Sequence, residues 1–370
     1  MSEAWDGRRT FYRRLQGYAG IGAGAGLALA GLGWWLAPHA FPHAWLGAFV
    51  LWTGLALGCL LLLMVGHLLG EDWLGPLRGE LEAGALTLPL LGAAAVPVLL
   101  GLGTLYPWAP TGAEGDPDVA FRSAWLSPVP FAVRSVGYFV VWGLFAWIVT
   151  RPGGHHRTAS AAGLVLVLPT TTLAAADWVM SLHPQWMSSV FGLAFGTGQA
   201  TAAFAAAVLV ATLRPDREPP GRIGQLAGAL LVLLAATAYL WFVQFLIVWS
   251  ANLPDEVSWY LERGGGWAWL MPGTALPAAG IAAALLLTRR ARAMRPVLIA
   301  ASLLLLVQHT ANHYWQIRPS VPELGLHWTD PVAVAALGLA CLVVFAHALP
   351  GRPVRAERAA GNDPVPPERE

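Results

Sequence analysis

Long apolar stretches recur along the whole chain, and short polar or Pro/Gly-rich segments separate them. Each stretch holds about twenty residues, the length of an α-helix that crosses the hydrocarbon core of a bilayer. A helix that is apolar on every side needs either lipid or a very large protein core around it, and a chain of 370 residues favours lipid. We therefore predict an all-α polytopic membrane protein with about ten transmembrane helices. The predicted spans are 18–36, 44–69, 84–105, 131–150, 159–180, 188–211, 223–250, 265–287, 296–315 and 328–349.

The arginines give these spans a direction. When the spans alternate across the membrane, all but four of the 22 basic residues fall on one side, and the chain contains no lysine. The exceptions are Arg122, Arg134, Arg263 and Arg318. Because short cytoplasmic loops carry the excess of positive charge, the arginine-rich side is predicted to be cytoplasmic, together with both termini.

Composition adds a domain description and excludes some classes of function. Only 12% of residues are charged and the net charge is +1, so nothing indicates a nucleic-acid partner. We predict a cytoplasmic N-terminal segment at 1–17, a membrane domain at 18–349 and a disordered cytoplasmic tail at 350–370. The first span is expected to be an uncleaved anchor. Cys59 and Cys341 lie within predicted spans, so neither a disulfide nor a metal site is expected.

Ionisable and amide side chains inside a span are costly and by default mark a functional site. Asp177 lies near the external end of the fifth span, and Gln244 lies in the external half of the seventh. His309 and His313 end the ninth span, and their spacing of four places both imidazoles on one helical face. Asn252, Asp255 and Glu256 follow the seventh span, also on the external side, whereas His67 lies in the cytoplasmic half.

Each of these residues also has a structural interpretation, which the sequence leaves open. Asp177 can pair with an external arginine at the membrane surface, and the two histidines can bond water or backbone there. Tryptophans at span ends are typical of an aromatic belt. Asp255 and Glu256 fit a solvated face, and His156 fits a solvated cytoplasmic turn with its neighbour His155.

Polar residues gathered near the external face favour a pocket in which a quinol releases protons outward. Such a pocket needs a proton acceptor, a hydrogen-bond partner for the quinol hydroxyl and apolar walls. A haem site is less favoured, because two axial histidines must come from different helices at one depth, and only His67 and His347 approach that arrangement. A transporter would place its polar groups nearer the midplane.

One segment resembles a known family. Asp177 to Trp186 reads Asp-Trp-Val-Met-Ser-Leu-His-Pro-Gln-Trp, and Ser-Ser-Val-Phe-Gly follows at 188–192. It resembles the Asp-Trp-x-Met-Ser-Leu-x-Pro-x-Trp segment of the ActF-type membrane subunits of alternative complex III, in the NrfD/polysulfide-reductase membrane-subunit superfamily. Segments at 58–73, 105–108 and 244–256 agree with that family in the same order.

The resemblance implies a ten-span subunit of the bacterial inner membrane, built from two four-helix bundles plus peripheral helices. It also implies a quinol-oxidising complex whose other members are a homologous NrfD-like membrane subunit, an iron–sulfur/molybdopterin-like subunit and multihaem and monohaem cytochrome c subunits. No covalently bound cofactor is expected, and quinone or quinol is the possible substrate. His183 and Gln185 depart from the family pattern, in which an acidic residue and a histidine are common, so no relay is carried over to them.

These considerations assign candidate roles. Proton handling is predicted for Asp177, His309 and His313, and a quinone pocket for Gln244, Asn252 and Trp186. Further candidates are His67, His183, Asp255 and Glu256. Two other functions stay open: a cofactor-free anchoring subunit, whose external residues His183, Trp186, Asp255 and Glu256 dock a partner, and a secondary transporter.

Overall fold

The computed structural model describes residues 2–70, 74–109, 125–152, 156–214, 220–320 and 325–349, with side chains from residue 10 onward except at 220–222. Every regular element within these ranges is helical. The tail predicted to be disordered, 350–370, lies outside the described residues. Eight long helices carry most of the fold: α1 (Ser2–Leu36), α2 (Phe41–Leu69), α8 (Pro128–Val149), α9 (His156–Trp178), α10 (Phe191–Leu213), α11 (Pro220–Ala251), α15 (Arg295–Ile317) and α16 (Thr329–Ala348).

Shorter elements complete the chain. A 3₁₀ turn at Gly75–Leu77 and α3 (Arg78–Ala85) lead into the third predicted span, 84–105, which is divided into the short helices α4 (Leu88–Ala94), α5 (Val96–Leu100) and α6 (Leu102–Leu105). The eighth begins with a 3₁₀ turn at Gly265–Trp269 and a π-helical turn at Met271–Ala275, and continues as α13 (Leu276–Leu286). Outside the spans lie α12 (Pro254–Leu261), α14 (Arg289–Arg292) and 3₁₀ turns at Met180–Leu182 and Arg318–Ser320.

The all-α polytopic class predicted from the sequence is confirmed. Nine helical segments of the described chain are long and apolar enough to cross a membrane. The remaining predicted span, the ninth at 296–315, corresponds to α15, which has 23 residues. Gln308, His309, Asn312 and His313 lie in its second half and make it less apolar than the other nine. The predicted span that is not among these nine segments therefore carries five buried polar side chains, Ser302, His309, Asn312, His313 and Gln316.

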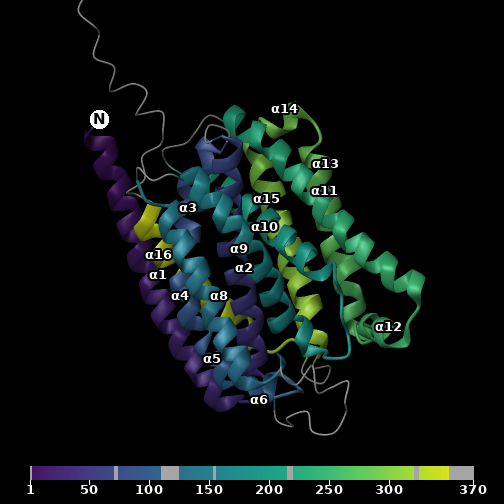
Figure 1. Cartoon of the computed structure of the whole chain (residues 1–370). Helices are drawn as coiled ribbons and strands as arrows, with labels where there is room; N and C mark the ends of the chain where they lie inside the picture. The colour runs from purple at the N-terminus through teal and green to yellow at the C-terminus, as the bar shows by residue number, and fades with distance from the viewer. Residues whose placement is uncertain are drawn as a thin grey trace, which may run out of the picture.

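Proline explains the breaks in the third span. Pro89 occupies the first turn of α4, and Pro97 occupies the first turn of α5. A proline has no N–H to donate and clashes with the preceding turn, so the helix stops before each one and restarts with it. Gly101 then separates α5 from α6. The prediction of one continuous helix at 84–105 was wrong in this respect, although the segment still passes along the bundle (Figure 1).

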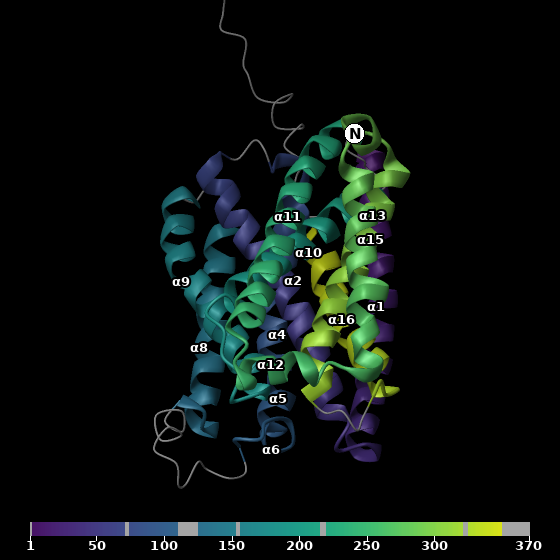
Figure 2. The ribbon, with the colours of Figure 1, turned by 90° about the vertical axis from the view of Figure 1, so that its right-hand side faces the viewer.

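The long helices pack as two groups of four with one peripheral pair. α2, the α3–α5 segment, α8 and α9 contact one another, and α10, α11, α13 and α15 form the second group. α2 and α10 join the groups, while α1 packs along α16 outside both. Figure 2 shows α8 and α9 on one side of α2 and the α13 and α15 helices on the other. This packing matches the two bundles with peripheral helices expected from the family resemblance.

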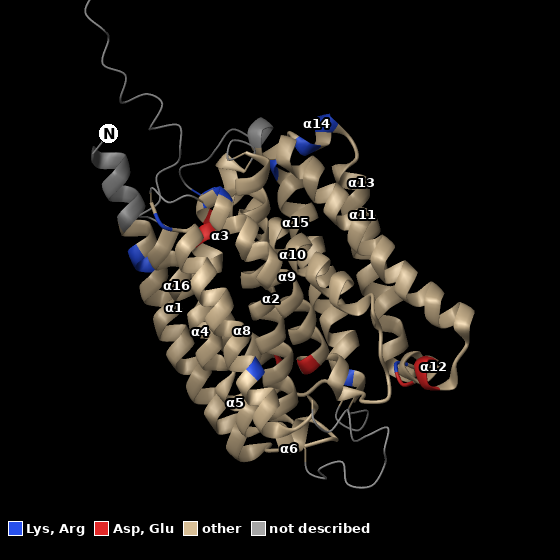
Figure 3. Ribbon diagram, in the orientation of Figure 1, with Lys and Arg blue, Asp and Glu red and all other residues tan. Residues whose placement is uncertain are grey.

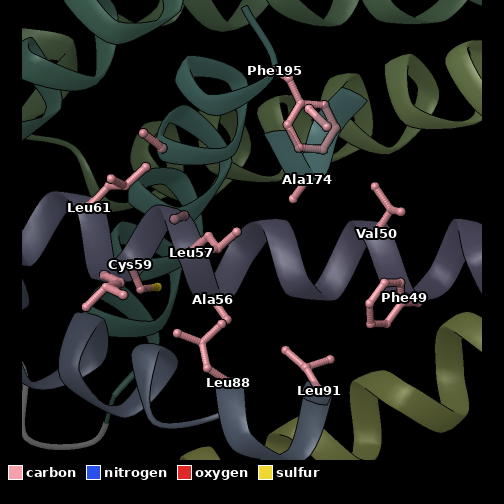
Figure 4. Packing of buried hydrophobic residues seen from close by; sticks show 14 of the residues in the cluster. Phe49, Val50, Ala56, Leu57, Cys59, Leu61, Leu88, Leu91, Ala174 and Phe195 are labelled. Carbon is pink, nitrogen blue, oxygen red and sulfur yellow. The ribbon is translucent and has the colours of Figure 1, made fainter. Parts of the chain in front are cut away.

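The core is centred on α2. Most of its side chains are buried, whereas α1 and α11 turn large hydrophobic residues outward. Figure 4 shows Phe49, Ala56 and Leu57 of α2 among apolar side chains of the neighbouring helices. Leu88 and Leu91 belong to α4, Ala174 to α9 and Phe195 to α10. The outward apolar surface of the other helices suits contact with lipid.

Both ends of the described fold lie at one end of the bundle. Leu349, just after α16, packs with Tyr12 in the first part of α1 and with Ala83 in α3. α14 and its arginines lie at this same end (Figure 3). The arrangement agrees with an even number of crossings. That this end faces the cytoplasm stays a prediction, because it depends on the arginine rule alone.

Candidate functional site

A polar cluster at the contact between α15 and α10 brings the two predicted histidines together. His309 and His313 are one turn apart on α15, and their ring centroids are 4.2 Å apart. Both side chains are buried. The helical spacing read from the sequence therefore describes their arrangement correctly. Phe195 of α10 packs against the His313 ring on its other side.

Gln199 of α10 bridges the two imidazoles and is itself completely buried. The Gln199 Oε1 atom lies 3.1 Å from His309 Nε2, and Gln199 Nε2 lies 2.8 Å from His313 Nε2. His313 Nδ1 lies 3.2 Å from the His309 carbonyl oxygen, so this nitrogen carries the proton. A neutral His313 then accepts at Nε2 from the amide, and His309 donates from Nε2 to the amide oxygen. The three side chains form a directional hydrogen-bond chain.

Two glycines of α2 make room for this amide. A Cβ atom at Gly54 would overlap the Gln199 side chain, and one at Gly58 would overlap the Gln199 carbonyl oxygen and Ala203. The pair has the spacing of a small-xxx-small motif, which allows two helix backbones to approach closely within a membrane. α2 therefore fixes the position of Gln199 from behind.

The same face of α15 continues with two buried amides. Asn312 and Gln316 are both nearly inaccessible. Asn312 Oδ1 and both side-chain polar atoms of Gln316 have no hydrogen-bond partner within the described part of the chain. Unsatisfied buried amides are costly and rare. These groups give the cluster hydrogen-bonding capacity that its own residues do not use.

Asp177 belongs to a different site, between α8 and α9. Arg134 donates to it from two nitrogens, with Nε to Oδ2 and Nη2 to Oδ1 both at 2.9 Å. Tyr138 donates its hydroxyl at 2.7 Å, and the Trp125 indole donates at 2.9 Å. The Trp125 ring also lies under the Arg134 guanidinium, 4.0 Å away. The carboxylate is fully buried and holds four hydrogen bonds.

The two parallel bonds from Arg134 form a forked pair, a strong type of charge-assisted contact. Ser181 ties the turn after α9 back to the Asp177 carbonyl, and Tyr106 donates to the carbonyl of Trp178. The geometry matches the structural interpretation of Asp177, pairing with an external arginine. Its predicted part in proton handling stays a prediction.

Gln244 and Asn252 occupy separate positions on α11. The Gln244 side chain is buried and accepts a hydrogen bond from Ser188, which in turn begins α10 by accepting from the Phe191 amide. Asn252 is exposed at the end of α11 with a φ of 50°. This left-handed conformation is one that asparagine tolerates well, and it ends the helix. The sequence placed these residues with Asp177 and the histidines by sidedness, whereas in the structure Gln244 bonds to Ser188 and Asn252 ends α11.

His183 and Trp186 take part in an aromatic layer under α12. The Trp186 ring stacks on Trp259 at 4.4 Å, and Trp259 meets Trp315 edge-on at 5.2 Å. His183 Nδ1 lies 2.8 Å from a carboxylate oxygen of Glu262. Burial and the charge of Arg263 lower the pKa of His183 to about 4. At neutral pH this contact is therefore a hydrogen bond from a neutral imidazole.

Arg263 is the centre of that layer. Its guanidinium lies 3.4 Å from the Trp259 ring centroid and donates to the carbonyl oxygens of Trp259, Trp315 and Gln316. Burial lowers the pKa of Arg263 to about 9, so it keeps its charge at neutral pH. The α12 segment is thereby attached to the end of α15. Asp255 and Glu256 lie in the first turn of α12, where a helix dipole favours acidic side chains, and Asp255 is exposed.

A second set of buried ionisable residues lies at the opposite end of the bundle. His67 of α2 donates to or accepts from Ser160 of α9 at 2.9 Å and stacks on His156 at 5.0 Å. His156 is buried, so the prediction of a solvated turn was wrong for it, whereas His155 lies outside the described residues. The direct stacking of these rings leaves no room for a haem between them, and His347 is exposed.

Charge is also buried at this end. Arg214, at the end of α10, forms an ion pair with Glu80 of α3 at 2.8 Å, and both are buried. The sequence indicated few polar groups within the membrane in this half of the molecule. Glu80 and Arg214 lie between predicted spans, where charged residues are ordinarily exposed loop residues. The tertiary contact of α3 with α10 is what buries them.

The sequence missed three partners. Gln199 lies in an apolar span and was passed over beside the histidines. Arg134 was expected only as one of four external arginines with which Asp177 can pair, although its place one turn inside a span is itself a signal of pairing. Arg263, between two spans, was counted only for topology. A fourth case is Arg318, which binds the Asp330 carboxylate at 3.0 Å and clamps the connection to α16.

The described residues contain no group of three side chains with metal-ligating geometry. No protein-family model matches the chain, and no curated protein matches it. The function of the chain is therefore inferred from its own residues and from the resemblance of the Asp177 segment to ActF-type membrane subunits.

Proposed function

We propose that the chain is an integral membrane subunit of a quinol-oxidising respiratory electron-transfer complex, of the ActF type found in alternative complex III, in the bacterial inner membrane. The observation that carries this proposal is the buried His309–Gln199–His313 chain. Ionisable groups inside a span are expensive to keep and are by default functional. Nine helical segments of the described chain that are long and apolar enough to cross a membrane support the membrane location. The complex is inferred from the family resemblance.

The proposed chemistry uses the cluster in two ways. The His309–His313 pair accepts one proton from a quinol hydroxyl and releases it toward the external face, while the Gln199 amide holds the two rings in position. The unpartnered amides of Asn312 and Gln316 supply hydrogen bonds that orient the hydroxyl groups. Aromatic and apolar side chains such as Phe195 form the wall.

The other predicted site residues take supporting roles in this proposal. Asp177 and Arg134 hold α8 against α9, and Gln244 holds α11 against the start of α10. Electrons leave the quinol through iron–sulfur and cytochrome c partner subunits, since this chain brings no covalently bound cofactor to the proposal. The agreement of the two four-helix groups with the family's architecture supports the assignment.

Isolation from native membranes tests the proposal. The chain carrying an affinity tag is expected to copurify with c-type haem and with a quinol-oxidising activity that reduces an added acceptor. Isolation of the chain alone, without haem absorbance or quinol oxidation, would overturn it. Substrate flux catalysed by the isolated chain in liposomes would favour a transporter instead.

An anchoring subunit is the second candidate, and α12 favours it. Asp255, Trp249 and Leu261 are exposed around this element, while Arg263 and the tryptophans hold it rigidly from below. A rigid external projection suits a docking role for a partner. This function predicts that changes at Asp255 release partner subunits while His309 variants keep full quinol oxidation.

A further inference from the structure

The connection between α13 and α15 carries a dense group of arginines. Arg289, Arg290, Arg292 and Arg295 occupy four of seven successive positions. Figure 3 shows basic residues at α14, at the end of the molecule where the N-terminus lies. None of the four forms an ion pair with an acidic residue of the described chain. Arg289 and Arg290 are exposed, and Arg292 and Arg295 are half-buried.

Local structure holds this group in a fixed turn. Thr288 caps α14 by accepting a hydrogen bond from the Ala291 amide at 3.2 Å. α14 packs against α11, where a Cβ atom at Gly224 would overlap the Arg292 carbonyl group. At Gly228, one turn further, a Cβ atom would overlap the Arg292 guanidinium. The two glycines thus let the turn and the Arg292 side chain lie directly on the α11 backbone.

The Arg292 side chain is fixed against α11, but one of its hydrogen-bond donors has no partner within the described chain. Its Nε atom is buried and has no hydrogen-bond partner in the part of the chain that the structure describes. A topology signal needs only positive charge on one side of the membrane. It requires neither this concentration of arginines nor a guanidinium fixed against a helix backbone.

The neighbouring apolar residues point to lipid. Leu287 and Met294 bracket the arginines along the chain, and both are exposed. They lie at the ends of membrane helices, where acyl chains run beside the protein. A phosphodiester meets guanidinium groups through short, forked hydrogen bonds, and basic pockets between membrane helices bind anionic headgroups.

We propose that the α13–α14–α15 turn, through Arg289, Arg290, Arg292 and Arg295, binds the headgroup of an anionic phospholipid. The phosphate lies against the guanidinium groups, and an acyl chain packs along Leu287 or Met294. The inference is independent of the quinol chemistry above, because it uses residues at the opposite end of α15 from the histidines.

Native mass spectrometry of the full chain in detergent tests this inference, with dioleoyl phosphatidylglycerol and dioleoyl phosphatidylcholine as probes. The chain is expected to retain phosphatidylglycerol in preference to phosphatidylcholine. Replacing all four arginines by glutamine is expected to weaken phosphatidylglycerol binding about tenfold. The matched control removes the same charge at the same end of the molecule, by Arg8→Gln, Arg9→Gln, Arg13→Gln and Arg14→Gln, and is expected to keep binding within about twofold.

Arg292→Gln alone is the second variant, in case the fourfold change prevents correct insertion. It is expected to weaken binding about threefold, since it removes the positioned guanidinium. Equal losses in the α14 and N-terminal variants, or no preference for phosphatidylglycerol, would overturn the proposal. Inorganic phosphate that displaces the lipid at similar concentration would assign the site to a free anion and would overturn the lipid assignment.

Discussion

Asp177 and His309 are both buried polar side chains, but their surroundings differ in kind. The carboxylate of Asp177 holds four hydrogen bonds, two of them from one guanidinium. His309 has a neutral amide as its partner and lies beside amides without partners of their own. The complete bonding of Asp177 suits a structural role, whereas the amide atoms beside His309 that lack partners within the described chain leave hydrogen-bonding capacity for a ligand.

Removing the Asp177 charge tests the structural role. Asp177→Asn leaves the half-buried Arg134 without its counter-ion and is expected to cost about 3 kcal/mol, measured by unfolding in detergent. Arg134→Gln is expected to cost a similar amount, and the double variant less than the sum of the two. Asp255→Asn, at an exposed position, serves as the control with a change below about 0.5 kcal/mol. Additive losses would contradict a direct pair.

The burial of His183 near the charged Arg263 predicts a pH dependence of stability. The ordinary pKa of histidine is 6.5, and that of His183 is lowered to about 4. Between these values the unfolded chain binds a proton that the folded chain does not bind, so stability falls as the pH is lowered from 6.5 toward 4. The resulting loss in the free energy of unfolding reaches up to about 3 kcal/mol near pH 4, and there is no such loss above pH 7.

Thermal unfolding in detergent between pH 7.5 and 4 measures this effect by comparison with His183→Gln. The substituted protein is expected to lose less stability on acidification than the original. Parallel curves for the two proteins would show that His183 does not titrate in this way.

At the scale of elements, two glycines determine how closely α10 approaches α2. Gly58→Ala is expected to destabilise the protein by about 1–3 kcal/mol, because its Cβ would overlap the Gln199 backbone and Ala203. Gly47→Ala, on the same helix, meets nothing within 4 Å and is expected to be neutral or stabilising by up to about 1 kcal/mol. Equal effects of the two changes in an unfolding measurement would contradict the proposed close contact.

Helix existence was predictable, and helix interruption was not. Apolar length located all the long helices, since lipid requires backbone hydrogen bonds within each segment. Pro89 and Pro97 were visible in the sequence, yet their effect depends on whether neighbouring helices satisfy the freed backbone groups. Pro169 shows the opposite outcome, because α9 continues through it while Thr170 and Thr171 bond to the preceding carbonyl groups. Tertiary surroundings decide between these outcomes.

The candidate site was also predictable only in part: contacts within one helix could be predicted, and contacts between helices could not. The spacing of His309 and His313 fixed their common face, but no local pattern indicates that Gln199, in another span, lies between them. The arginine partners of Asp177 and of the aromatic layer depend likewise on which helices become neighbours. Sidedness grouped Asp177, Gln244 and the histidines, and only packing separates them.

At the scale of the whole molecule, the arginine rule predicts which end of the bundle faces the cytoplasm. Single cysteines introduced at Arg290 and at Asp255 are expected to react with a membrane-impermeant thiol reagent from the cytoplasmic and the external side, respectively. The native Cys59 and Cys341 are buried, so their background reaction is expected to be low. Labelling of both positions from one side would contradict the alternating topology, and reversed sides would contradict the arginine rule.

The most direct test of the central claim is the quinol oxidation rate of the purified complex with His309→Asn or His313→Asn in this chain. The exposed His347→Asn is the matched control. We expect assembly and haem content to be preserved, turnover to fall at least about tenfold in either cluster variant, and the control to keep its rate, since a lost proton acceptor typically costs about 10²–10⁴-fold. Full turnover in both assembled cluster variants would contradict the account.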